Sequence, residues 1–206
     1  GPTQEAVDPV RYITNHSTGK MGYAIAKIAS RRGAEVTLVS GPTAEEEPAF
    51  VNVVNVCSAK EMFEAVKERA QEQDIIIKAA AVADYRPKHI RGSKMKKTED
   101  GSDLTLELER TDDILAYLGA HKKQGQFLCG FAMETEDLIA NAKRKLEKKR
   151  LDMIAANSLR VEGAGFGGNT NVVTVITKEK EVSFGKMTKE ETAAELLTMI
   201  AEARKV

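Results

Sequence analysis

The sequence predicts an α/β protein built in three layers, in which helices flank both faces of a mostly parallel sheet. Three observations lead to this prediction. Helical and strand-like patterns alternate along most of the 206 residues. Several strand-like segments are apolar throughout, as strands buried on both faces usually are. A glycine-containing turn leads directly into the first helical segment.

The amino-terminal quarter contains the first helix and the first two predicted strands. The segment Ser17–Gly22 runs into an apolar helical pattern over residues 19–32. Gly33 is expected to end this helix, because glycine readily adopts the left-handed conformation found just beyond helix ends. Val36–Val39 and Val51–Val56 have the β-branched composition of short strands.

The next part of the chain repeats the alternation of helix and strand. Ser58 and Glu61 form a capping-box signature, which predicts a helix that continues to about Gln71. Asp74–Val82 follows as a predicted buried strand, because its apolar residues run on without alternation.

Two more apolar segments, Gln126–Phe131 and Leu151–Ala156, are predicted to be buried strands of the same sheet. Between them lies a helical pattern, Glu136–Lys149, which Thr135 is expected to cap. A strand, a helix and a second strand in this order favour a parallel pair joined by a crossover.

The carboxy-terminal part is predicted to contain a hairpin and a final helix. The hairpin pairs Val172–Thr177 with Glu181–Phe184. Thr188 and Glu191 form a second capping-box signature, which opens a helix that ends near Arg204.

Three features depart from the regular alternation. Leu104–Glu109 alternates strictly between apolar and polar residues, which predicts a half-exposed strand and a possible site for dimerisation. Residues 88–103 are polar and are predicted to form a mobile flap. Gly1–Thr14 contains no good strand pattern, so we expect a first strand upstream of residue 1. Residues 1–206 are otherwise expected to form a single domain.

The composition excludes several classes of protein. Lysine plus arginine and aspartate plus glutamate number 31 each, and this zero net charge argues against general binding to nucleic acid or to membranes. No apolar run reaches the length of a membrane span, so a cytoplasmic location is expected. Cys57 and Cys129 stand in apolar contexts and are expected to be buried free thiols.

The turn before the first helix is predicted to bind an anion. Glycines at a helix start let backbone N–H groups approach a phosphate, and the helix dipole adds positive charge. The turn is not a Walker A loop, because Thr14 replaces the first glycine and Met21 replaces the Ser/Thr. A dinucleotide site is also disfavoured, because no acidic residue follows Val39. The alternative is that these glycines serve only close packing of the helix on the sheet.

Further candidate groups lie at the carboxyl ends of predicted strands, where α/β proteins bind ligands. Asp84 follows one strand and can accept from ribose hydroxyls, hold a metal ion or simply cap a turn. Phe131 follows another strand and can pack on a ring or in the core. The flap carries Lys94, Lys96 and Lys97. For these lysines the alternative is a solvated charged surface.

Lys145 and Lys149 lie four residues apart and therefore share one face of a predicted helix. They too can be either ligand contacts or solvated surface. The three histidines, His16, His89 and His121, show no spacing of metal ligands, and no catalytic triad can be identified. The residues alone therefore predict a nucleotide- or polyphosphate-binding domain of unspecified reaction.

Several motifs in order closely resemble the phosphopantothenoylcysteine synthetase family, a ligase family of coenzyme A biosynthesis with a Rossmann-like fold. The resemblance covers nearly the whole chain and rests on GPTQEAVDPVRYITNHSTGKMGYAIA, AAAVADYRP, KMKK, GFAMET and KRKLEKKRLDMIAAN. It implies CTP-dependent condensation of 4'-phosphopantothenate with L-cysteine through an acyl-cytidylate, releasing pyrophosphate and then CMP. It also implies Mg²⁺, a homodimer and, in many bacteria, fusion to a flavin-dependent decarboxylase domain.

The resemblance also assigns roles to particular residues. Arg11 would contact the pantothenate phosphate across the dimer, Asn15 would hold the acyl group and intermediate, and Lys94 would assist formation of the acyl-cytidylate. Asp84 would contact the ribose or the metal. The remaining expected CTP contacts are Ser17, Thr18, Gly19, Lys78, Ala79, Ala80, Asp112, Asp113, Ile114, Leu115, Phe131, Lys145 and Lys149.

The chain departs from the family pattern at one position. Asp112 occupies the place of a proline in the family's Asn-Pro-Asp-Ile-Leu motif, which here begins with Thr111. Two other functions stay open at this point. One is an NAD(P)-dependent oxidoreductase, although the lack of an acidic residue after Val39 counts against it. The other is a non-catalytic nucleotide-sensing domain.

Overall fold

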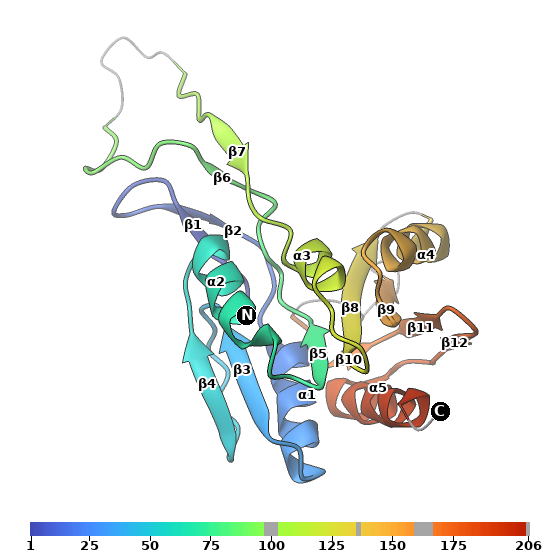
Figure 1. Ribbon diagram of the computed structural model, residues 1–206. Helices are drawn as coiled ribbons and strands as arrows, with labels where there is room; N and C mark the ends of the chain where they lie inside the picture. The colour runs from blue at the N-terminus through green and yellow to red at the C-terminus, as the bar shows by residue number, and fades with distance from the viewer. Residues whose placement is uncertain (97–102, 135–136, 159–166, 205–206) are drawn as a thin grey trace.

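The computed structural model describes residues 1–96, 103–134, 137–158 and 167–204, and it confirms the predicted α/β class (Figure 1). The central sheet has five strands in the order β12–β11–β9–β8–β5. Strands β5 (Ile75–Lys78), β8 (Phe127–Glu134) and β9 (Met153–Ser158) run parallel. Strands β11 (Val173–Thr177) and β12 (Glu181–Ser183) form the predicted hairpin, which continues the sheet in antiparallel fashion.

Helices cover both faces of this sheet. On one face, α1 (Lys20–Arg31) and α5 (Lys189–Ala203) contribute to a core with the inward side chains of β8, β9 and β11. On the other face, α2 (Ala59–Ala70), α3 (Ile114–Ala120) and α4 (Leu138–Lys148) bury a second cluster. The alternation of side chains along β9 explains the two clusters, since successive residues point to opposite faces.

A separate parallel pair, β3 (Val36–Ser40) and β4 (Val51–Asn55), lies on the other side of the amino-terminal segment. The N–H of Thr3 donates to the carbonyl of Ala81, just beyond β5, at 3.2 Å. A Cβ added at Gly41, just beyond β3, would lie only 1.9 Å from the carbonyl oxygen of Pro2. The amino-terminal segment therefore passes between the carboxyl ends of β3 and β5. The expected strand upstream of Gly1 stays a prediction.

The structure corrects two predictions near the chain start. Strands β1 (Gln4–Ala6) and β2 (Tyr12–Thr14) pair antiparallel in a stretch expected to lack strands. Strand β5 ends at Lys78 and does not continue to Val82. It ends early because Thr3 binds the following segment through the Ala81 carbonyl and through its own Oγ1, which accepts from the N–H of Ala83 at 3.0 Å.

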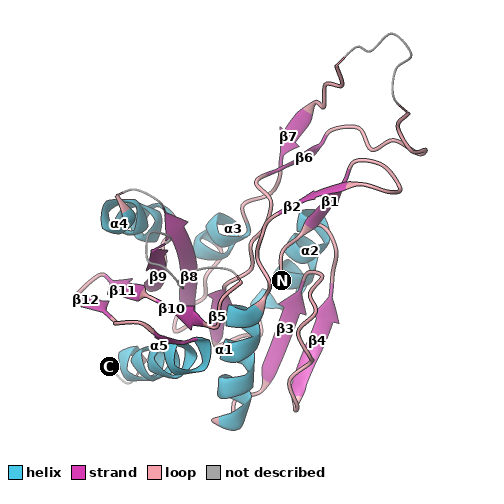
Figure 2. Cartoon of the chain, turned by 180° about the vertical axis from the view of Figure 1, so that it is seen from behind, coloured by secondary structure: helices cyan, strands magenta, loops and turns pink. Residues whose placement is uncertain are grey.

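Strands β6 (Tyr85–Pro87) and β7 (Leu108–Arg110) form an antiparallel arm that projects from the body beside β1 and β2 (Figures 1 and 2). The half-exposed strand predicted over Leu104–Glu109 is wrong in extent, since only Leu108–Arg110 forms a strand, and its apolar face is not covered. Its leucines, Leu104, Leu106 and Leu108, are all exposed, at 56%, 39% and 45%. These side chains are exposed because the arm extends away from the helices and the central sheet.

Most of the remaining elements agree with the prediction, but α3, β10 (Thr170–Asn171) and β13 (Met187–Thr188) were not predicted. Both capping boxes form, at the starts of α2 and α5. Helix α4 begins after Asp137, whereas the expected cap Thr135 lies outside the described residues. Cys129 is buried as expected, but Cys57 is exposed at the end of the β4 segment. The short strands β10 and β13 pair with each other. Within the described ranges, every helix is too short or too polar to traverse a lipid bilayer.

Candidate functional site

The turn before α1 requires glycine at position 19, because its backbone is left-handed and its neighbours lie close. This residue caps the helix with a φ of 84°. A Cβ added there would lie 3.1 Å from Thr43 Oγ1 and 3.2 Å from the Cα of Gly1. Thr43 Oγ1 also donates to the carbonyl of Thr18 at 2.7 Å. Across the described chain, no side chain caps this helix, so its first N–H groups remain available to an anion.

The same turn lies beside the segment that follows β5. Asn15 Nδ2 donates to the carbonyl of Ala81 at 3.0 Å. A Cβ added at Gly22 would lie 4.0 Å from the Cβ of Ala79. The structure therefore brings the predicted contacts Asn15, Ser17 and Gly19 together with Ala79 and Ala80, at the carboxyl ends of the strands.

A small polar pocket of about 70 Å³ lies on the α3 and α4 side of this edge. Lys149 Nζ pairs with Asp113 Oδ2 at 2.9 Å, and Asp113 also caps α3 by accepting from the N–H of Ala116. The residues that line the pocket are Lys78, Val82, Asp84, Thr111, Asp112, Asp113, Ile114 and Lys149. Five of the predicted CTP contacts thus meet there with Asp84.

The charged groups of this pocket are coupled to one another, since Lys78 and Lys149 lie among three carboxylates. Burial lowers the pKa of Lys78, and the nearby charges of Lys149 and Lys145 lower it further, against the opposing effect of Asp113 and Asp84. The pKa of Asp113 is also lowered, since its bonds with Lys149 and with the backbone outweigh the opposing effect of burial. A bound phosphate would relieve the repulsion among the three lysines.

Other predicted residues lie farther from this pocket or play a different part. Leu115 is a core residue, 5% exposed, whose side chain packs closely on Gly130. Phe131 packs on the α1 and α5 side of the sheet, the face opposite Lys145 and Lys149. Its predicted ring contact stays a prediction.

Arg11 and Lys94 lie together on the arm side of the site. Arg11 forms an ion pair with Asp8, and its Nη2 also donates to the carbonyl of Met95, the neighbour of Lys94. Lys97, a further lysine of the flap, lies outside the described residues. Sequence analysis missed Asp8, although it stands in the same DPVR run as Arg11.

The fit of a magnesium ion depends on Asp84 and Asp112. Among the described residues, no group of three or more His, Cys, Asp or Glu side chains is placed to hold a metal ion. Mg²⁺ is nevertheless often held by one or two carboxylates together with substrate phosphates and water. Asp84 and Asp112 are exposed carboxylates on the same pocket, whereas Asp113 is paired with Lys149. The donor set therefore suits a Mg²⁺ ion that arrives with a nucleotide.

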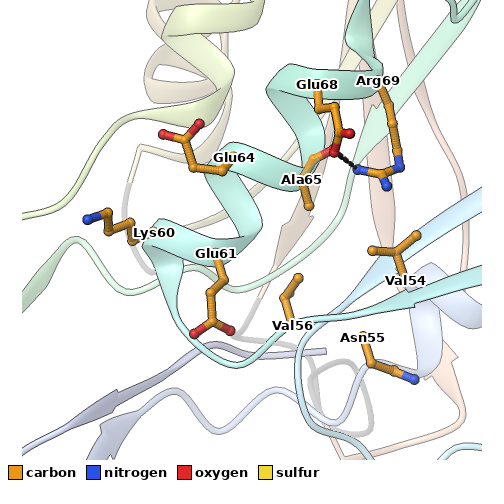
Figure 3. A pocket seen from close by; sticks show the side chains of 9 residues that line it. All are labelled: Val54, Asn55, Val56, Lys60, Glu61, Glu64, Ala65, Glu68 and Arg69. Atoms are coloured by element: carbon orange, nitrogen blue, oxygen red, sulfur yellow. Dashed lines mark hydrogen bonds and ion pairs between the residues drawn. The ribbon is translucent and has the colours of Figure 1, made fainter.

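A larger open groove of about 630 Å³ lies elsewhere, between β4 and α2 (Figure 3). None of the predicted site residues lines it. Its wall carries Glu61, Glu64 and Glu68 against Lys60 and Arg69, and Glu68 pairs with Arg69. The smaller pocket is the better candidate site, because Asp84 and five of the predicted CTP contacts line it.

Comparisons with known proteins identify the family of the chain. Residues 1–203 match the family described as the DNA/pantothenate metabolism flavoprotein C-terminal domain. The chain is 48% identical over 200 residues to the coenzyme A biosynthesis bifunctional protein CoaBC of Vibrio vulnificus, covering 97% of this chain and 50% of the relative. It is 51% identical over 180 residues to the CoaBC of Bacillus subtilis, covering 87% and 44%.

Among solved structures, a C-terminal domain of CoaBC superposes with a TM-score of 0.84 at 44% identity, covering 100% of this chain and 92% of that one. The chain spans about half the length of the curated relatives it matches.

Proposed function

Since the chain belongs to the DNA/pantothenate metabolism flavoprotein C-terminal domain family, we propose that it ligates 4'-phosphopantothenate to L-cysteine at the expense of CTP. The products would be 4'-phosphopantothenoylcysteine, CMP and pyrophosphate. The observation that supports this most directly is that two candidate anion-binding features lie at one edge of the sheet. One is the pocket lined by Lys78, Lys149 and Asp84, and the other is the start of α1, which has no side-chain cap. The relatives are named for coenzyme A biosynthesis, and we extend that role to this chain.

The proposed reaction has two steps. First, a carboxylate oxygen of phosphopantothenate attacks the α-phosphorus of CTP, the bond to the β-phosphate oxygen breaks, and pyrophosphate leaves. Then the amine of cysteine attacks the acyl carbon, the carbon–oxygen bond breaks, and CMP leaves as the amine loses a proton. Attachment to a nucleotide supplies the leaving group that a free carboxylate lacks.

The first step brings two anions together, which explains the need for fixed positive charge. The N–H groups of α1 would bind phosphate at the turn Ser17–Gly19. Lys78, Lys145 and Lys149 would neutralise the nucleotide from the α4 side, and Lys94 would act on the reacting phosphate. Asp84 and Asp112 would hold Mg²⁺, which would supply further charge neutralisation on the phosphates.

The acyl group and its phosphopantothenate tail would lie on the arm side. Asn15 would hold the acyl group, and the hydrogen bond from its amide to the Ala81 carbonyl supports this role by fixing the orientation of the side chain. Arg11 would bind the terminal phosphate, and it retains an exposed side chain for this purpose, at 46%.

We also propose that the protein works as a homodimer that pairs through the arm. The arm and the neighbouring β1–β2 segment expose several large apolar side chains, and contiguous apolar patches on a surface usually mark an interface. The residues concerned are Val10, Tyr12, Tyr85, Ile90, Leu104, Leu106 and Leu108. Because the relatives are bifunctional and about twice as long, we propose that a flavin-dependent decarboxylase domain acts beside this one.

The deciding experiment measures pyrophosphate release with CTP and 4'-phosphopantothenate, with and without cysteine, and again with ATP in place of CTP. Release that requires phosphopantothenate, prefers CTP and turns over only with cysteine would support the ligase and its order of steps. No release with either nucleotide from folded protein would refute it. CTP binding without turnover would then favour a sensor, and a change in nicotinamide fluorescence on titration would favour an oxidoreductase.

A further inference from the structure

Among the described residues outside the pocket, the carboxylate of Asp8 accepts the largest number of hydrogen bonds. Asp8 lies between β1 and β2 and is 3% exposed. Its Oδ1 accepts from the N–H groups of Val10 at 2.8 Å and Arg11 at 2.9 Å. Its Oδ2 accepts from Arg11 Nε at 3.0 Å and Nη2 at 2.5 Å, and from the N–H of Met95 at 3.1 Å. One buried carboxylate therefore accepts five hydrogen bonds.

The ion pair of Asp8 and Arg11 holds both backbone polar groups of Met95. The Met95 N–H donates to Asp8, and the Met95 carbonyl accepts from Arg11 Nη2 at 3.0 Å. A third bond, from the N–H of Arg91 to the carbonyl of Val7 at 3.1 Å, docks the same two segments. We name these three residues, Asp8, Arg11 and Met95, the latch.

The latch decides where the first flap lysines lie. Met95 stands between Lys94 and Lys96, and both lysines are exposed. With both backbone polar groups of Met95 bound, the Cα of the adjacent Lys94 is held near one place, and the reach of its ammonium group is set mainly by its side-chain rotamers. Without the latch, the backbone itself would be free to move.

The latch leaves part of Arg11 free for a ligand. The guanidinium uses Nε and Nη2 on Asp8 and Met95, and among the described residues no hydrogen bond to Nη1 is found. An anion can therefore bind at Nη1 without breaking the latch. The Arg11 guanidinium also holds the pKa of the Asp8 carboxyl well below its usual range, so Asp8 is ionised at neutral pH.

We propose that Asp8 is a positioning residue, which acts through Met95 and Arg11 to hold Lys94 at a fixed place relative to an anionic substrate group on Arg11. The role rests on the proposed ligase function, since it concerns the lysine that serves the first step. Asp8 itself touches no substrate. Its removal therefore slows the chemistry of the first step and leaves nucleotide binding in the pocket intact.

The test compares Asp8→Asn with the matched control Glu109→Gln. Asparagine keeps one side-chain oxygen that can accept from the N–H groups of Val10 and Arg11, so the turn is preserved. It loses the negative charge and the second oxygen, which accepts from the Arg11 guanidinium and the Met95 N–H. Glu109, on β7 of the neighbouring arm, pairs with Arg86 at 2.8 Å, and the described bonds of Met95 go to Asp8 and Arg11 instead. Thermal unfolding verifies that both variants are folded.

The first measurement needs no substrate. Trypsin cleavage after Lys94 and Lys96, followed by mass spectrometry, should be about tenfold faster in Asp8→Asn, because charged hydrogen bonds are lost, and unchanged in Glu109→Gln. In the unaltered chain, the Met95 amide should exchange with solvent far more slowly than in an unstructured peptide. Equal cleavage of both variants, or fast exchange at Met95, would overturn the latch.

The second measurement is pyrophosphate release under saturating substrates. Asp8→Asn should lower kcat by about tenfold to a hundredfold, because a displaced catalytic group loses its alignment, and should leave the KM for CTP unchanged. If Asp8→Asn is cleaved faster but keeps a normal kcat, the latch holds the Met95 backbone without affecting catalysis, and the proposal fails. If the unaltered chain releases no pyrophosphate, the proposed function fails and with it the positioning role. Proteolysis and exchange then still decide the latch itself.

Discussion

Gly19→Ala tests whether the turn before α1 must be glycine for both backbone and steric reasons. Gly19 has a φ of 84°, and a left-handed conformation costs a residue with a Cβ about 1–2 kcal/mol. The added Cβ also meets Thr43 Oγ1 at 3.1 Å and Gly1 Cα at 3.2 Å. Crowding of this kind typically costs about 1–3 kcal/mol more. We therefore expect the variant to lose about 2–5 kcal/mol of unfolding free energy.

Gly33→Ala is the matched control. Gly33 ends the same helix with a φ of 85°, and an added Cβ there would meet nothing within 4 Å. This variant should lose only the backbone term, about 1–2 kcal/mol, and should bind CTP normally.

Urea unfolding and CTP titration, applied to both variants, separate the two effects. Gly19→Ala should weaken CTP binding by about tenfold or more, since each 1.4 kcal/mol of lost binding free energy is tenfold in Kd. Equal losses of stability in the two variants would refute the steric argument. Equal CTP affinity would refute the assignment of this turn to the nucleotide.

Three further predictions concern acid stability, assembly and thiol reactivity. Because Arg11 lowers the pKa of Asp8, the stabilisation by this carboxylate is fully present above about pH 4 and is lost as the pH falls further. Acid unfolding of the unaltered chain should therefore begin at a lower pH than that of Asp8→Asn. A higher onset in the unaltered chain would show that the sign is wrong. Leu106→Lys should shift the mass measured by light scattering from dimer to monomer, and an unchanged mass would exclude the arm as the interface. A thiol reagent should modify Cys57 in the folded chain but Cys129 only after denaturation, whereas modification of both in native buffer would contradict the burial of Cys129.

Elements set by neighbouring residues could be predicted from the sequence. The capping boxes of Ser58 with Glu61 and of Thr188 with Glu191 involve residues three apart, so the starts of α2 and α5 were predicted correctly. Helix α3 was missed because its signal is short, a single cap at Asp113. The burial predicted for Leu104–Glu109 was wrong, since alternation reveals two faces but not whether anything covers them.

The candidate site shows the same limit more clearly. The glycine turn, Asp84 and the lysine pair on α4 could be found as separate signals in the sequence. That Lys149 pairs with Asp113, 36 residues away, and that Asp8 binds Met95, 87 residues away, depends on tertiary packing. No local pattern carries such information, and Asp8 was therefore overlooked.

The way in which α1 begins has a consequence for the order of folding. Helices α2 and α5 carry their start signals within their own sequences and can begin to form before distant contacts exist. Helix α1 instead starts at a left-handed glycine, whose neighbour Thr18 is bound by Thr43 from beyond β3. We therefore expect its first turn to form late, after β3 has docked, so that the nascent chain acquires its phosphate-binding turn only when the surrounding fold is nearly complete.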